Sequence, residues 1–347
     1  MLKVIGFIPC RSGSKRIVDK NLSLFNSKTL IQNIYDKAEL ASCIDHIVVS
    51  TDSSEYLDSL CKGSKYIDIG LRSKKNSMDD STDYDVLKEV LEKLKSINLE
   101  FQYIIHLRPT YPALLKENID HAFNFFQNQS KATSLKSVEK LDLYYQKCLI
   151  QDSHDSNKLI GLDGDERNYA SSIPSQKCQN IYAQTAAIDI YKKDVIKSGE
   201  LWGNYCLKYE FGNVSADIDN YFDYPMAYNA LDQLAIKKKI KNGEQVEICC
   251  DIDGVLFSRT SENQYDSAFP NIGIINLLKL IKNSGFRLVL HTARGSKTGK
   301  DWEEVTKKQL AKYDITFDEL KFGKPGSDFY IDDKGITMHQ LKKIFNL

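Results

Sequence analysis

Apolar residues along the chain recur in two ways, as short continuous runs and as longer stretches with helical spacing. In the first part of the chain the runs predict three buried strands, at Val4–Pro9, His46–Thr51 and Tyr103–Leu107. Three stretches with helical spacing alternate with them, at Leu30–Ala41, Tyr84–Leu94 and Ile119–Gln127. This alternation predicts an α/β fold, a mostly parallel sheet with helices on both faces.

The same rhythm begins again after a long helical stretch, Pro225–Lys241. Predicted strands follow at Val246–Cys250, Phe286–Leu290 and Phe329–Ile331, and predicted helices at Ile272–Asn283 and Asp301–Lys312. We therefore predict two domains, residues 1–232 and 246–347, joined by a helical linker at 233–245.

Composition narrows the class of protein. A length of 347 residues suits two domains, since domains usually hold roughly 100–200 residues. Lys plus Arg and Asp plus Glu both number 47, which argues against a nucleic-acid partner held by bulk positive charge. The 8 cysteines include no CxxC pair, which disfavours structural zinc. The first apolar run is too short to enter a membrane, so we expect a soluble, cytoplasmic protein.

Small residues and cations follow the first predicted strand. Gly13 and its neighbouring serines would let the backbone approach phosphate oxygens closely. Four cations lie in the same loop: Arg11, Lys15, Arg16 and Lys20. The loop departs from the GxxxxGK[ST] pattern, which disfavours a P-loop NTPase.

The loop resembles a family signature. Pro9-x-Arg11-x-Gly13-Ser14-Lys15-x-Ile17-x-x-Lys20-Asn21 is similar to that of the CMP-sialic acid synthetase family of cytidylyltransferases. Three later segments resemble further family motifs in the same order: Val48–Ser53, Leu107–Pro112 and Ser215–Asn220. The resemblance covers about residues 3–230. It implies a Rossmann-like nucleotidyltransferase domain that uses CTP and forms a homodimer or higher homo-oligomer.

The resemblance also implies roles for individual residues. Those that would bind the nucleotide are Arg11, Ser14, Lys15 and Asn21, with Lys20 as the catalytic cation on the phosphates. Asp217 and Asp219 would bind Mg²⁺. Two carboxylates one residue apart on a strand face the same side and can share a hard cation. Without the family context, an exposed loop end would be the preferred interpretation of this pair.

The family pattern breaks where the acceptor would bind. Arg108 replaces a Gln, Ser175-Gln176 replaces Arg-Gln, and the segment from Thr185 to Asp189 replaces Asn-Gly-Ala-Ile-Tyr. We expect Arg108, Gln176 and Thr185 to face the acceptor. An Arg can hold a phosphate bidentately, so a sugar or polyol phosphate and a CDP-linked product are expected. The alternative is that Arg108 meets the carboxylate of a sialic-like 2-keto-3-deoxy acid, giving a CMP-linked product.

A second set of candidate residues closes the strands of the second domain. Asp251 and Asp253 are one residue apart. This spacing suits a nucleophile and a general acid/base that flank one phosphate. Thr292 offers a hydroxyl to phosphoryl oxygens and Lys324 a cation. Asp332-Asp333 offer metal ligands.

This order of motifs resembles the haloacid dehalogenase (HAD) superfamily of phosphatases over about residues 246–340. The resemblance implies that Asp251 is the nucleophile, Asp253 the acid/base, Thr292 the phosphate binder and Lys324 the charge stabiliser. It places Mg²⁺ on Asp251, the Asp253 carbonyl and Asp332, with Asp333 in support. The intervals between motifs leave no room for a sizeable cap, so a small capless HAD-like α/β domain is expected.

The leading hypothesis is a bifunctional enzyme that supplies precursors for a surface or capsule polysaccharide. Its first domain would activate a sugar with CTP, and its second would remove phosphate from a related metabolite. The competing hypothesis is a nucleotide-binding scaffold with a degenerate phosphatase domain.

Overall fold

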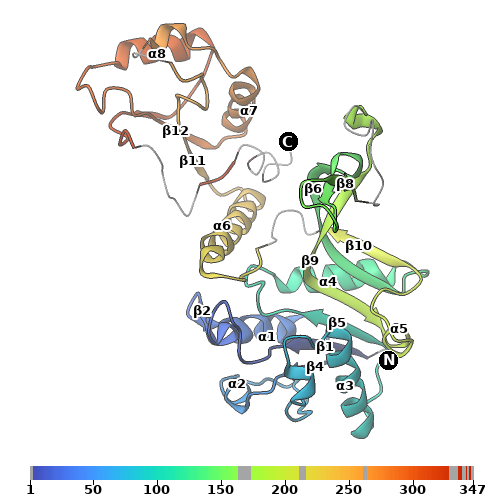
Figure 1. Cartoon of the computed structure of the whole chain (residues 1–347). Helices are drawn as coiled ribbons and strands as arrows, with labels where there is room; N and C mark the ends of the chain where they lie inside the picture. The colour runs from blue at the N-terminus through green and yellow to red at the C-terminus, as the bar shows by residue number, and fades with distance from the viewer. Residues whose placement is uncertain are drawn as a thin grey trace. The chain divides into compact units, whose positions relative to one another are not determined.

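The computed structural model describes residues 3–162, 173–210, 216–260, 264–327, 335–337, 341 and 344. The chain divides into two compact units, Met1–Ala227 and Tyr228–Leu347, and each is described by itself (Figure 1). The division falls within helix α6 (Tyr224–Lys241), near the start of the linker expected at 233–245.

A six-stranded sheet forms the centre of the first unit, with the strand order β10-β6-β9-β5-β1-β4. The strands are β1 (Val4–Pro9), β4 (His46–Ser50), β5 (Tyr103–Leu107), β6 (Ser134–Tyr144), β9 (Asn180–Lys192) and β10 (Cys206–Glu210). Neighbours are parallel except at β9, which runs antiparallel to both β5 and β6. The predicted mostly parallel α/β sheet is therefore confirmed, with one reversed strand inside it.

Helices cover both faces of the sheet (Figure 1), because β1 is apolar along its whole length and its successive side chains point to opposite faces. Val4 and Ile8 lie in the core formed with α1 (Leu30–Leu40) and α4 (Lys116–Gln127). Ile5 and Phe7 lie in the opposite core with α3 (Asp83–Ser96). A capping box between Thr82 and Asp85 fixes where α3 begins.

Shorter elements connect these layers. They are η1 (Lys20–Leu22), β2 (Leu24–Phe25), β3 (Lys28–Thr29), α2 (Ser54–Asp58), η2 (Lys75–Ser77), η3 (Tyr145–Lys147), β7 (Leu149–Gln151), β8 (Leu159–Gly161), η5 (Ser175–Lys177), α5 (Lys193–Lys197) and η6 (Tyr221–Asp223).

Strand β9 contains a bulge, which includes the candidate residue Thr185. The register between β6 and β9 passes from Lys136↔Asp189 directly to Val138↔Gln184. The intervening β9 residues, from Thr185 to Ile188, are accommodated by Ser137, whose hydroxyl accepts from the Ile188 N–H at 3.1 Å. A bulge of this kind redirects side chains and frees carbonyls for other partners.

The second unit holds a parallel sheet with the order β11-β12-β13 in its described part. Its elements are β11 (Glu247–Cys250), η7 (Tyr265–Ser267), α7 (Ile272–Asn283), β12 (Arg287–His291), α8 (Glu303–Lys312) and β13 (Glu319–Lys321). Leu278, Leu290 and Leu310 are buried in its core. The strand predicted at Phe329–Ile331 lies outside the described residues. Throughout the described ranges, each helix is too short or too polar to cross a membrane.

Candidate active sites

The candidate metal ligand Asp219 lies beside two cations of the loop after β1. Lys20 Nζ donates to Asp219 Oδ1 at 2.9 Å, and Arg16 Nη1 donates to Oδ2 at 2.7 Å. Burial would raise the pKa of the Asp219 carboxyl, but the bonds from Lys20 and Arg16 outweigh it and lower that pKa. The fold thus joins residues about two hundred positions apart into one charged cluster, as the family resemblance implies.

Asp217, the second carboxylate of the pair, is exposed and lies between two buried residues, Ala216 and Ile218. The Ile218 N–H donates to the Thr110 carbonyl at 2.9 Å, which ties this segment to the turn after β5. Burial raises the pKa of Asp217, and the nearby charge of Asp219 raises it further, although a hydrogen bond with Thr110 opposes this. A divalent cation bound to both carboxylates would relieve this repulsion.

The remaining loop cations pair with a carboxylate that the sequence did not single out. Arg11 Nη1 donates to Asp79 Oδ1 at 2.6 Å, and Lys15 also pairs with Asp79. The Asn21 amide donates to the Arg11 carbonyl at 3.1 Å. Ser14 lies half-buried in the same loop. All the predicted nucleotide-binding residues therefore belong to one segment. Asp79, from outside that segment, pairs with two of its cations.

Two further residues at this edge were given no role by the sequence analysis. Asp52, after β4, accepts from the Ser12 N–H at 2.7 Å and from its hydroxyl at 2.8 Å, which holds the loop in place. Arg72 is buried and donates to the Ser50 carbonyl at 2.5 Å. Burial lowers the pKa of Arg72. No motif pointed to Arg72, since its partners are backbone and hydroxyl groups brought together by the fold.

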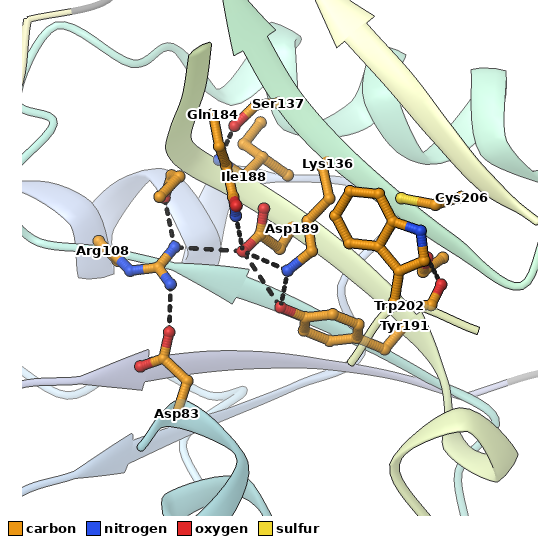
Figure 2. A network of polar contacts seen from close by, with 12 residues as sticks. Asp83, Arg108, Lys136, Ser137, Gln184, Ile188, Asp189, Tyr191, Trp202 and Cys206 are labelled. Carbon is orange, nitrogen blue, oxygen red and sulfur yellow. Dashed lines mark hydrogen bonds and ion pairs between the residues drawn. The ribbon is translucent and has the colours of Figure 1, made fainter. Parts of the chain in front are cut away.

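Arg108 does not stand free for a phosphate, contrary to the expectation from the sequence. Its Nη1 donates to the Ala186 carbonyl at 2.6 Å and to Asp189 Oδ2 at 3.3 Å, and its Nη2 pairs with Asp83 (Figure 2). The side chain is 20% exposed. Two carboxylates already neutralise this guanidinium, so a third anion meets a weaker field than a free Arg would offer.

Asp189 is the buried centre of this network. Its Oδ2 accepts from Lys136 Nζ at 3.1 Å and from the Tyr191 hydroxyl at 3.1 Å, and Lys136 also donates to Tyr191 at 2.7 Å (Figure 2). Within the described part of the chain, Asp189 Oδ1 and both ring nitrogens of His106 are buried without a hydrogen-bond partner. Burial and the cations nearby lower the pKa of His106.

The two other predicted acceptor residues occupy different settings. Thr185 is buried in the β9 bulge, where its hydroxyl donates to Ser137 Oγ at 2.9 Å and its carbonyl accepts from the Tyr111 hydroxyl. Thr185 therefore supports the bulge and is not open to an acceptor. Gln176 is exposed on η5, and no hydrogen bond among the described residues joins it to Arg108.

In the second unit, the predicted nucleophile and charge stabiliser are in direct contact. Lys324 Nζ donates to Asp251 Oδ2 at 2.6 Å. The other oxygen of Asp251 accepts from the Ile252 N–H at 2.8 Å. Gly254 adopts φ +88° and its N–H donates to the Phe257 carbonyl, so a tight turn needs glycine here.

The predicted acid/base, Asp253, is gripped by an arginine that the sequence analysis passed over. Arg294 Nε donates to Asp253 Oδ2 at 2.9 Å and Nη2 donates to Oδ1 at 2.7 Å. Thr292 is buried, and its hydroxyl lies 3.5 Å from Asp253 Oδ2. The structure thus places Asp251, Asp253, Thr292 and Lys324 at the carboxyl ends of β11 and β12 or in the loop after β13.

A bound metal ion is compatible with the first unit. The described residues contain no group of three His, Cys, Asp or Glu side chains arranged around a metal position. Mg²⁺ commonly takes only one or two protein carboxylates and completes its shell with phosphate oxygens and water, so Asp217 and Asp219 would be enough to hold one. Asp332 and Asp333, the metal ligands predicted for the second unit, lie outside the described residues.

Comparison with known proteins identifies the first unit. The sequence profile of the cytidylyltransferase family matches residues 5–198, and the chain belongs to that family. The match confirms the nucleotidyltransferase predicted from the motifs. It ends before the second unit, so the predicted HAD-like phosphatase stays a prediction.

Several relatives carry names that specify an acidic sugar. CMP-N,N'-diacetyllegionaminic acid synthase of Legionella pneumophila is 28% identical over 234 residues, which are 67% of this chain and 96% of that protein. N-acylneuraminate cytidylyltransferase of Escherichia coli is 25% identical over 267 residues, 76% of this chain and 58% of that protein. Pseudaminic acid cytidylyltransferase of Campylobacter jejuni is 34% identical over 132 residues, 38% and 56% of the two chains.

Solved structures include a CMP:2-keto-3-deoxy-manno-octonic acid synthetase complexed with CTP. It is 15% identical, with a TM-score of 0.47, and the match covers 68% of this chain and 99% of that one.

Proposed function

We propose that the first unit transfers CMP from CTP to a hydroxyl of an acidic, sialic-like sugar. This was the alternative in the sequence analysis, and it now replaces the sugar or polyol phosphate as the first choice. The similarity to the legionaminic, neuraminic and pseudaminic acid enzymes supports it. The homo-oligomer implied by the resemblance and the cytoplasmic location expected from the sequence stay predictions, and light scattering of the purified protein would test the first.

The observation that carries the proposal is the cluster of Lys20 and Arg16 on Asp219 beside Asp217. In the reaction, the acceptor oxygen attacks the α-phosphorus of CTP and the bond to the β-phosphate oxygen breaks. Pyrophosphate leaves, and the hydroxyl proton passes to water or a base. Lys20 would turn to the phosphates and stabilise their developing charge. Mg²⁺, held by Asp217 and Asp219, would supply further positive charge on the phosphate oxygens.

The charge around Arg108 favours a carboxylate over a phosphate as the acceptor's anion. Arg108 and Lys136 carry two positive charges and Asp83 and Asp189 two negative ones, so the cluster is formally neutral. A guanidinium has five N–H donors, and three of those on Arg108 have the partners described above. The other two can meet a singly charged carboxylate, whereas a doubly charged phosphate would need more compensation.

An acceptor screen tests this assignment. Pyrophosphate release would be measured with CTP and Mg²⁺ against 2-keto-3-deoxy acids in parallel with hexose and polyol phosphates. We expect turnover with an acidic sugar only. Turnover restricted to a sugar phosphate would restore the first expectation, and no turnover with any acceptor would favour the scaffold hypothesis.

A second candidate function concerns the second unit, for which we propose phosphate-ester hydrolysis. The observation that favours it is the adjacent pairing of Asp251 with Lys324 and of Asp253 with Arg294. Asp251 would attack phosphorus, the ester oxygen would leave with a proton from Asp253, and water would then cleave the aspartyl phosphate. Hydrolysis of aryl, sugar and polyol phosphates is the assay. Loss of activity in Asp251→Asn, with CTP-dependent activity retained, is the expected result.

A further inference from the structure

Arg294 is a fully buried arginine whose partner reaches the candidate phosphatase site. Its side chain is 0% exposed, while that of Asp253 is 23% exposed. Its Nε and Nη2 hold the two oxygens of Asp253 at 2.9 and 2.7 Å. A buried guanidinium needs a partner for its charge, and here the partner is a carboxylate at the exposed end of the strand.

The rest of the guanidinium is fixed from the other side by α8 and η7. Nη1 donates to Thr306 Oγ1 at 3.0 Å, and Nη2 donates to Gln309 Oε1 at 2.8 Å. The Tyr265 ring lies 4.2 Å from the guanidinium carbon. Gln309 in turn donates to the Tyr265 carbonyl at 2.8 Å. Arg294 therefore has one position, and it imposes one orientation on Asp253.

The hydrogen bonds from Arg294 leave the Asp253 carboxylate able to transfer a proton. A carboxylate has about four acceptor positions, and Arg294 takes one on each oxygen. Asp253 can therefore exchange a proton with a ligand without displacing Arg294. Ile252, between the two aspartates, is fully buried, so the chain on either side of it is anchored in the core. Asp251 is held separately, by Lys324.

We propose that Arg294 is a positioning residue that orients the Asp253 carboxylate for proton transfer to the leaving oxygen and from the attacking water. Arg294 touches no reacting atom and acts only through Asp253. This inference rests on the phosphatase function proposed for the same unit.

A double-mutant cycle tests it, with the phosphate ester of a simple aliphatic alcohol as the substrate because its alkoxide leaving group needs a proton. We expect Arg294→Met to lower kcat by roughly 100-fold and to change KM little, since general acid–base catalysis contributes on that order. In Asp253→Asn the further change Arg294→Met should have no effect, because the carboxylate that Arg294 orients is already gone. Arg294→Lys should recover part of the activity, since an ammonium can hold one oxygen but not both.

Controls separate this role from stability. Arg287→Met is the matched control: Arg287 lies on β12 and pairs with Glu247 and Glu319 at the surface, so its loss should leave kcat within about twofold. Thermal unfolding reports whether each variant folds. If Arg294→Met does not fold, Gln309→Met, which removes one bond to Arg294, should give an intermediate loss of kcat that again disappears in Asp253→Asn.

The outcomes distinguish the two proposals. Losses that add in the double variant, or an Arg294→Met enzyme with wild-type kcat, would overturn the positioning role and leave the phosphatase standing. A wild-type chain that hydrolyses none of the phosphate esters would overturn both.

Discussion

Asp79 Oδ1 lies 2.6 Å from Arg11 Nη1. Arg11, which is expected to bind CTP, is therefore already paired with a carboxylate of the chain itself. Lys15 pairs with the same carboxylate. Both side chains of the Arg11 pair are partly exposed, at 38% and 48%, so the pairs are weak and can exchange partners. A triphosphate would compete with Asp79 for these cations.

Asp79→Asn should therefore tighten CTP binding by roughly a few-fold at low salt, because exposed ion pairs of this kind are weak. The advantage should shrink as ionic strength rises. Isothermal titration with CTP measures it. Asp80→Asn is the matched control, since Asp80 is an exposed neighbour with no ion pair among those found in the described residues. Weaker binding in Asp79→Asn would mean that Asp79 helps to hold the nucleotide.

The sequence predicted the elements whose apolar pattern is continuous. The predicted bounds of β1 and β5 agree with the structure, because both strands are buried on two sides. The helix predicted to begin at Ile119 begins at Lys116, since its first turn is polar. No strand was predicted at β6 or β9. Polar residues such as Lys136 and Asp189 interrupt their pattern, and these become buried only by pairing with each other.

The prediction of site residues was likewise limited to those that lie in a recognisable sequence pattern. Motifs located Lys20, Asp219, Asp251 and Lys324, which the fold does bring into ion pairs. Arg294 stood two residues after a predicted site residue and was still missed. Its role depends on Thr306, Gln309 and Tyr265, whose contacts with it arise only from the packing of α8 and η7.

Lys37 gives a pH-dependent contribution to stability. It donates to the Pro112 carbonyl at 2.5 Å, and burial lowers its pKa to about 7. Between pH 7 and its ordinary pKa near 10.4 the unfolded chain binds more protons at this residue than the folded one, so the free energy of unfolding rises with pH there. The melting temperature of wild type minus that of Lys37→Met should therefore increase from pH 7 to pH 10. The exposed Lys74→Met should show no such trend, and a flat difference for Lys37→Met would exclude the shift.

Ala186 carries backbone strain in the β9 bulge. Its φ is +58°, a left-handed conformation that favours glycine, and the resembled family has glycine at this position. Ala186→Gly should stabilise the protein by up to about 1 kcal/mol. Glycine relieves the strain in the folded chain, and we expect this gain to exceed the cost of the greater conformational entropy of the unfolded chain. Thermal unfolding measures it, with Ala187→Gly as the control, since that neighbour is buried and should lose stability. A lower melting temperature for Ala186→Gly would show that the methyl group contributes more than its strain costs.

Two single substitutions should separate the two proposed activities. Asp219→Asn removes a carboxylate from the cluster with Lys20 and Arg16, so CTP-dependent pyrophosphate release should fall by roughly 100-fold or more. Phosphate-ester hydrolysis should be unchanged in that variant, because the second site draws on Asp251, Asp253, Thr292 and Lys324. Asp251→Asn should give the reverse pattern. Both activities would be measured on the full chain from one preparation, with Asp194→Asn, an exposed carboxylate on α5, as the control. If one substitution abolished both activities, the two reactions would depend on a common site, and the assignment of separate chemistry to the two units would be wrong.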